Sequence, residues 1–170
     1  DAMPFRSRGS YSNTYTIPYY TIVSYLPSSG MMWLARILGF SFSHTVIMGR
    51  LGYLLCYVLV VYFAIKQLKY GKLFLSSLCL LPTILFMAGD YSYDPFCIAF
   101  ILLGRCIWMG VYQRPESKMT AVKTTVTLLA LTMGILPKTV YFPLVLFVLF
   151  LPGNRFESKA AAKRYRIAVS

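Results

Sequence analysis

Two aspartates, Asp90 and Asp94, are the side chains of this sequence best suited to chemistry. They are the only acidic residues between Ala2 and Pro115, and they lie in a short polar stretch between two long apolar runs. Carboxylates so close to hydrocarbon are costly unless they face a protein interior or a wet cavity. Because a carboxylate there can act as a general base or bind a divalent cation, we predict that both belong to a functional site and are its catalytic candidates.

A structural role is the alternative for Asp94. The following Pro95 disfavours helical angles at Asp94, and an Asp just before a Pro at the first helical position makes a good N-cap. Both interpretations therefore stay open for Asp94. Asp90 has no comparable capping position, so the sequence favours a functional role for it.

Basic and aromatic residues elsewhere in the chain could complete such a site. Arginine and lysine can hold a phosphate or pyrophosphate, and tyrosine rings can stack on a sugar. The phosphate-binding candidates are Arg50, Lys138 and Arg36, and the substrate-binding candidates are Tyr91, Tyr93 and His44. The structural alternatives are cations that extend to the membrane interface, interfacial tyrosines and a polar His at a helix end. The sequence predicts no zinc site, and a divalent cation is the one cofactor it leaves open.

The composition is that of a membrane protein. The 170 residues are 58% hydrophobic and only 13% charged, with a mean hydropathy of +0.62, whereas soluble domains carry about 25% charged residues. The formal net charge of +12 does not predict nucleic-acid binding, because the Lys and Arg residues lie mainly between apolar runs, as orientation signals do. Anionic membrane lipid is the phosphate partner that this charge indicates. The four cysteines lie in or beside apolar runs without a Cys-x-x-Cys pair, which predicts packing residues: Cys56, Cys79, Cys97 and Cys106.

The patterning predicts an all-α integral membrane protein with about five spanning or half-length helices. Residues 1 to about 25 are expected to be extended and external. A turn at Tyr25–Gly30 and a helix over Met31–Phe40 should follow, either in the interface plane or as a buried connection. The expected spans are 44–65, 73–88 with a kink at Pro82, 95–111, 124–136 and 140–151. The last two are shorter than the ~20 residues that cross a bilayer.

Three parts follow from this pattern. Residues 1–43 form an external and interfacial segment, residues 44–152 a transmembrane domain, and residues 153–170 a basic cytoplasmic tail or loop. The loops at 66–72, 113–123 and 153–166 are rich in Lys and Arg, so the positive-inside rule places them in the cytoplasm. Asp90, Asp94 and Lys138 should then share the external face of the membrane, and Arg36, His44 and Arg50 could converge there with them.

Several short motifs follow one another along the chain. In order, they are Tyr25-x-Pro27-x-x-Gly30, Gly49-Arg50-Leu51 with Tyr57, Ala64-Ile65-Lys66, Leu81-Pro82, Tyr91-Ser92-Tyr93-Asp94, Leu136-Pro137-Lys138 and Tyr141-Phe142-Pro143. Together they resemble a bacterial family of predicted multi-pass membrane proteins known only as a domain of unknown function. The similarity covers about Ile17 to Pro152.

That family resembles a branch of the GT-C superfamily, integral membrane glycosyltransferases that use polyprenyl-phosphate sugars on the external side. The resemblance implies a transferase acting on lipid-linked phosphosugars, with Arg50, Asp94 and Lys138 carried over from matching motifs. GT-C enzymes usually place a catalytic acid in the first external loop, after an initial span, and no acid lies between Asp1 and Asp90. The chain, which begins at Asp1 rather than Met, is therefore expected to be part of a longer membrane protein. A transporter or channel component and a non-catalytic membrane scaffold are the alternatives.

Overall fold

The computed structural model describes residues 22–114, 116–141 and 143. Its elements in this part of the chain are helices. They are α1 (Ile22–Ile37), α2 (Phe42–Gln67), α3 (Lys72–Cys79), α4 (Pro82–Ala88), α5 (Asp94–Gln113), α6 (Ala121–Ile135) and the short 3-10 helix η2 (Thr139–Tyr141). The expected extended segment up to residue 21, most of the segment 140–151 and the basic tail lie outside the described residues.

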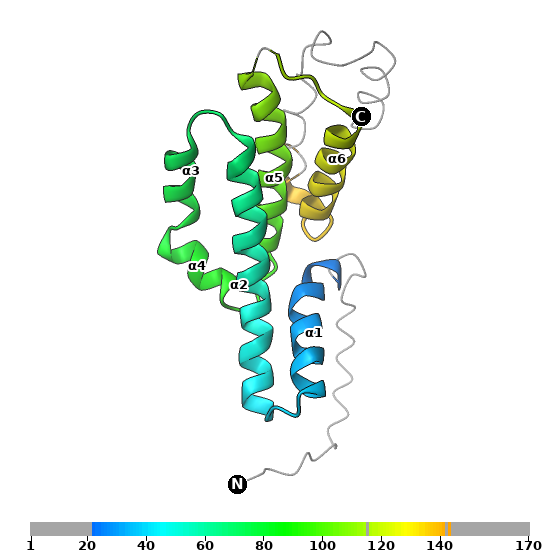
Figure 1. Ribbon diagram of the computed structural model, residues 1–170. Coiled ribbons are helices and arrows are strands. Elements are labelled where there is room, and N and C mark those ends of the chain that lie inside the picture. Colours follow the sequence, from blue (N-terminus) through cyan, green and yellow to red (C-terminus); the bar gives the residue numbers. More distant parts are fainter. Residues whose placement is uncertain (1–21, 115, 142, 144–170) are drawn as a thin grey trace.

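Helix α2 is the centre of the arrangement (Figure 1). Helix α1 runs back beside the first half of α2, whereas α3, α4 and α5 lie beside its second half and α6 packs on α5. Within the described residues, α2 and α5 are the two helices long and apolar enough to cross a membrane. Both were predicted as spans from the sequence, and α6, with 15 residues, has the reduced length that was predicted for it. Within the described residues, the predicted all-helical fold is thus confirmed, and two of its helices have the length and composition of membrane spans.

The predicted turn at Tyr25–Gly30 is wrong. These residues are part of α1, which contains Pro27 in its interior and ends before Gly39, a residue with a φ of 73°. The backbones of α1 and α2 come so close that a Cβ at Gly52 would lie 2.6 Å from the carbonyl oxygen of Pro27. Close packing of this kind stabilises membrane helices in spite of a proline, so tertiary contact overrides the local turn signal.

The orientation predicted for this N-terminal helix is also corrected. Because α1 lies lengthwise against α2 and is nearly as apolar, it is one arm of a helical hairpin (Figure 1). It is therefore not a helix perpendicular to the first span, as an interface-plane helix would be. It is not a buried connection either, since Trp33 on α1 is 67% exposed.

The second predicted span is two short helices rather than one. Helix α3 ends at Cys79 and α4 begins at Pro82, whose missing N–H costs nothing at a helix start. In an unbroken helix the carbonyl of Cys79 would accept a backbone hydrogen bond from four residues on. Here the hydroxyl of Tyr57 on α2 donates to that carbonyl over 2.9 Å. The kink expected at Pro82 is therefore a complete break of the helix. Helix α2 provides a hydrogen-bond donor for one of the backbone carbonyls that the break leaves without a helical partner.

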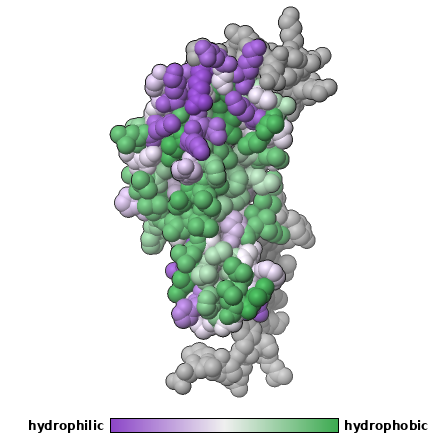
Figure 2. Space-filling model, viewed as in Figure 1, coloured by the Kyte–Doolittle hydropathy of each residue, from purple (hydrophilic) through white to green (hydrophobic). Residues whose placement is uncertain are grey.

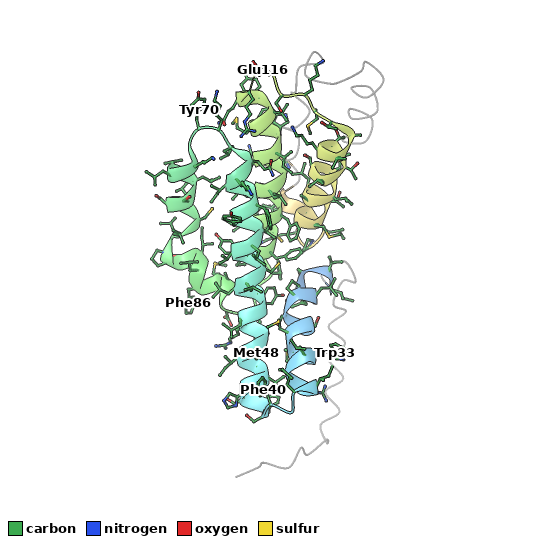
Figure 3. All side chains as sticks on the ribbon, viewed as in Figure 1. Trp33, Phe40, Met48, Tyr70, Phe86 and Glu116 are labelled. Atoms are coloured by element: carbon green, nitrogen blue, oxygen red, sulfur yellow. The ribbon has the colours of Figure 1, made fainter. Side chains whose placement is uncertain are left out.

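The two ends of the bundle differ in polarity. Figure 2 shows hydrophilic residues gathered at the end formed by the α2–α3 and α5–α6 loops, above a broad apolar band. This end contains the two basic loops that were predicted to share one side, and Tyr70 and Glu116 mark it in Figure 3. The α4–α5 loop with Asp90 lies at the other end of α5. By helical rise it is about 25–30 Å away, close to the thickness of a hydrocarbon core.

Candidate functional site

The candidate site is built on the loop between α4 and α5, which contains Asp90, Tyr91, Ser92 and Tyr93. Helix α4 ends at Ala88, and α5 begins at Asp94, followed by the buried Pro95. The N-cap position belongs to Tyr93, and among the hydrogen bonds of the described residues none joins a backbone N–H to the Asp94 carboxylate. The interpretation of Asp94 as an N-cap is therefore wrong, and its carboxylate is directed to another partner.

That partner is Lys138, at the break that follows α6. The ammonium of Lys138 donates a hydrogen bond of 3.1 Å to Oδ1 of Asp94. Buried Pro137 and a hydrogen bond from the Lys138 backbone N–H to the carbonyl of Ile135 fix this break. The hydrogen bond to Asp94 raises the pKa of Lys138 above its ordinary value. The ammonium is consequently charged at any physiological pH.

Two aromatic rings accompany this ion pair. The Lys138 ammonium lies 5.9 Å from the centre of the Tyr93 ring and 5.6 Å from that of Tyr141. These distances are within the range of cation–π attraction. Tyr141 was not among the predicted site residues, although it belongs to the Tyr141-Phe142-Pro143 motif and follows Lys138 by less than one turn.

The second ion pair joins the same loop to α2. A guanidinium nitrogen of Arg50 lies 3.8 Å from Oδ1 of Asp90, and the two side chains are 53% and 57% exposed. The Arg50 guanidinium also lies 5.9 Å from the centre of the Tyr91 ring. Such an exposed pair contributes only about 0–1 kcal/mol to stability. Arg50 is thus held near the loop while remaining open to other anions.

Tyr91 anchors the loop to the α1–α2 hairpin. Its hydroxyl donates a hydrogen bond of 2.7 Å to the carbonyl of Val46, and its ring meets that of Tyr53 edge to face at 6.3 Å. Gly49 makes room for this contact, because a Cβ there would lie 2.5 Å from the Tyr91 hydroxyl. The hydroxyl of Tyr91 is therefore engaged in packing. The ring of Tyr93 lies near Lys138. Its hydroxyl makes no hydrogen bond among the described residues.

Two predicted residues lie apart from this cluster. Gly49 of α2 faces Met32 of α1, so Arg36, one turn further along α1, lies toward the α1–α2 loop. His44 is at the start of α2, where its Nδ1 lies 2.6 Å from the hydroxyl of Ser41. The structure therefore brings Arg50, Asp90, Asp94 and Lys138 to one loop together with Tyr91 and Tyr93. It leaves Arg36 and His44 at the tip of the hairpin.

The cluster combines two cations and two carboxylates, so its formal charges cancel. In the described part of the chain, no group of three or more His, Cys, Asp or Glu side chains is placed to hold a metal ion. What the arrangement offers is two cations on different elements, each paired with a carboxylate at the α4–α5 junction. The two carboxylates nearby can accept protons or hydrogen bonds.

Comparison with known proteins gives the family but not an activity. No curated protein and no solved structure matches the sequence. The profile of the family described as "Predicted membrane protein (DUF2142)" matches residues 2–169, nearly the whole chain. With its apolar helices α2 and α5, the protein therefore belongs to the DUF2142 family of predicted membrane proteins.

Proposed function

We propose that the protein is part of a membrane transferase of the GT-C type that binds a lipid-linked phosphosugar at the loop between α4 and α5. Arg50 and Lys138 hold the phosphate, Asp94 serves as the base that activates the acceptor, and Asp90 orients Arg50. One observation carries this proposal. Cations from two separate parts of the chain meet the only two acidic residues between Ala2 and Pro115 on one short loop.

The position of the loop relative to the expected hydrocarbon core supports a lipid-linked substrate. Helix α5 is about 30 Å long, which is the thickness of a hydrocarbon core, and the loop lies at its N-terminal end. Large apolar side chains on α2 beyond Arg50 are exposed, among them Leu51, Leu55 and Leu59. A polyprenyl chain can lie along such a face while its phosphate stays at the level of Arg50. In the proposed orientation, the basic loops are cytoplasmic and this loop is external.

The electrostatics of the cluster suit an exchange of anions. An arginine can bind a phosphate through two parallel hydrogen bonds, and a lysine ammonium acts as a compact point charge. The Arg50–Asp90 pair is exposed and weak, so giving up Asp90 for a phosphate costs about 1 kcal/mol at most. When Lys138 turns to the phosphate, the carboxylate of Asp94 is released as a proton acceptor. If a divalent cation takes part, the carboxylates of Asp90 and Asp94 would be the side chains to hold it, and its charge would offset that of the phosphate.

Binding of polyprenyl phosphate to the purified protein in nanodiscs tests the proposal, with polyprenyl alcohol as the matched ligand that lacks the phosphate. Arg50→Ala and Lys138→Ala should each weaken binding of the phosphate about tenfold or more, because a hydrogen bond to a charged group contributes about 1.5–3 kcal/mol. Binding of the alcohol should not change. Lys118→Ala, a cation at the opposite end, is the control and should leave both ligands unaffected.

Asp94→Asn separates binding from chemistry. The variant should bind polyprenyl phosphate at least as well as the wild type, since the competing carboxylate charge is gone, but should lose sugar transfer. If no variant changes phosphate binding, the four charges are structural and the protein acts as a scaffold. If phosphate binding depends on both cations while Asp94→Asn keeps full activity, the site binds lipid phosphate but Asp94 is not its base.

A further inference from the structure

The opposite end of the bundle contains a second candidate site, which does not depend on the proposed transferase function. A cavity of about 470 Å³ lies between the α2–α3 loop, α3 and α5. This volume is in the range of small-molecule sites. The walls are mainly apolar, with Leu68, Phe74, Leu75, Cys106, Trp108 and Met109 among the lining residues. Arg105 also lines the cavity, about 12 Å below the end of α5 by helical rise.

A second, polar cavity adjoins it. Lys69, Arg114, Glu116 and Ser117 line this space of about 640 Å³. Lys69 is followed in the chain by Tyr70, and Arg114 is preceded by Gln113, and both of these neighbours line the apolar cavity. The two cavities are therefore neighbours at the end of the bundle that Tyr70 and Glu116 mark in Figure 3.

Gln113 fixes the α2–α3 loop, which contributes residues to both cavities, to the end of α5. Its Oε1 accepts hydrogen bonds from the backbone N–H groups of Lys69 (2.8 Å) and Tyr70 (3.0 Å), and its Nε2 donates to the carbonyl of Tyr70 (3.3 Å). Gly110, one turn earlier on α5, allows the backbone of Gln67 into direct contact. The α2–α3 loop, which lines both cavities, is thus fastened to the end of α5.

The excess of positive charge at this end of the bundle favours an anionic ligand. Among the described residues it contains one acidic side chain, Glu116, against six basic ones, namely Lys66, Lys69, Lys72, Arg114, Lys118 and Lys123. Basic pockets beside apolar grooves between membrane helices bind the head groups of anionic lipids.

We propose that these two cavities bind one anionic phospholipid, with an acyl chain against Trp108 in the apolar cavity and the phosphate between Lys69 and Arg114. The site takes a bilayer lipid from the leaflet at the basic end. It is separated from the Arg50–Lys138 site by the length of α5.

The two tryptophans of the chain provide the experiment. Trp33 lies on the hairpin, far from Tyr70 and Glu116 (Figure 3), and Trp33→Phe leaves Trp108 as the only tryptophan. This variant is placed in nanodiscs that contain increasing fractions of phosphatidylglycerol or phosphatidylcholine with brominated acyl chains, which quench tryptophan on contact. Phosphatidylglycerol should quench Trp108 at a mole fraction about fivefold lower for each participating cation.

Charge variants locate the effect. Lys69→Gln with Arg114→Gln, in the Trp33→Phe background, should abolish the preference, whereas Lys118→Gln, which lines neither cavity, should keep it. Trp108→Phe, which reports on Trp33, should show no preference. Equal quenching by both lipids would overturn the proposal. A preference that survives in the double variant, or that falls equally in Lys118→Gln, would overturn it as well, because it would reflect the overall charge of the surface.

Discussion

Gly49 couples the candidate site to the α1–α2 hairpin, and Gly49→Ala is the sharpest test of how the site is held. A Cβ at this position would lie 2.5 Å from the hydroxyl of Tyr91, 2.8 Å from Cγ of Met32 and 3.0 Å from Oγ of Ser28. All three are side-chain atoms rather than backbone atoms, so the neighbours can move. The Tyr91 hydroxyl is the nearest, and moving it breaks its 2.7 Å hydrogen bond to the carbonyl of Val46.

Two opposing contributions set the expected change in the free energy of unfolding for Gly49→Ala. Loss of the Tyr91 hydrogen bond costs about 0.5–1.5 kcal/mol, whereas alanine in place of glycine in a helix gains up to about 1 kcal/mol. The net change in the free energy of unfolding for Gly49→Ala should therefore be small. In a Tyr91→Phe background the hydroxyl is absent, so the alanine substitution mainly adds the stabilisation that comes from its higher helix propensity. The double variant should be more stable than the sum of the single effects by about 0.5–1.5 kcal/mol.

The assay is equilibrium unfolding in mixed detergent micelles, followed by tryptophan fluorescence, for the four members of this cycle. Gly30→Ala is the matched control, because Gly30 lies in α1 and a Cβ there would meet nothing within 4 Å. It should stabilise the protein by about 0.5–1 kcal/mol with no coupling to Tyr91→Phe. Additivity of Gly49→Ala and Tyr91→Phe within about 0.3 kcal/mol would refute the coupling. Phosphate binding should fall to a similar extent in both single variants, since each releases the loop from α2.

Two further predictions concern packing and loop attachment. Gly52→Ala should destabilise the protein by about 1–3 kcal/mol, because its Cβ would lie 2.6 Å from the carbonyl oxygen of Pro27, and a backbone atom cannot move aside as a side chain can. Stability equal to that of Gly30→Ala in the same titration would contradict this. Gln113→Ala removes three hydrogen bonds to the α2–α3 loop and should cost about 1–3 kcal/mol. It should also speed amide hydrogen exchange at the two loop residues that it binds, and unchanged exchange would show that the loop is held by other contacts.

The two long helices were predictable because of the length of their apolar runs. The structure gives α2 and α5 bounds within two or three residues of the predicted spans, and both are long and apolar enough to cross a membrane. Pro82 correctly marked an interruption. The sequence could not show that the helix would stop altogether, because the break depends on the hydroxyl of Tyr57, which reaches the carbonyl of Cys79 from another helix.

The N-terminal hairpin was not predictable from local signals. Pro27 and Gly30 lie within six residues, a pattern that ordinarily marks a turn. The glycines of α2 overrule it by letting the two backbones approach, and nothing in the α1 sequence reveals these partners. The same error displaced Arg36, because a helix lying in the interface plane would bring it to the Asp90 loop, whereas a hairpin arm places it at the tip.

The contribution of each site residue was predictable to different degrees. The alternation of basic and non-basic loops was enough to place Lys138 on the same side as Asp90 and Asp94, and the structure brings them together. Tyr141 and the carbonyl of Val46 were missed, since no charge marks them. Contacts of a tyrosine ring with an ammonium, or of a hydroxyl with a helix carbonyl, become visible only when the helices are packed.

Asp94 shows why a local rule failed where a tertiary contact was available. An N-cap needs extended backbone angles at the capping residue, but Tyr93 has φ −80° and ψ −12°, so helical angles already begin before Asp94. A carboxylate in the first helical turn still gains about 0.3–1 kcal/mol from the helix dipole, and this one also accepts a hydrogen bond from Lys138. Because no cap is lost, Asp94→Asn should leave the start of α5 intact and cost little stability. A loss of sugar transfer in that variant therefore reports on the chemistry of the carboxylate and not on the folding of the loop.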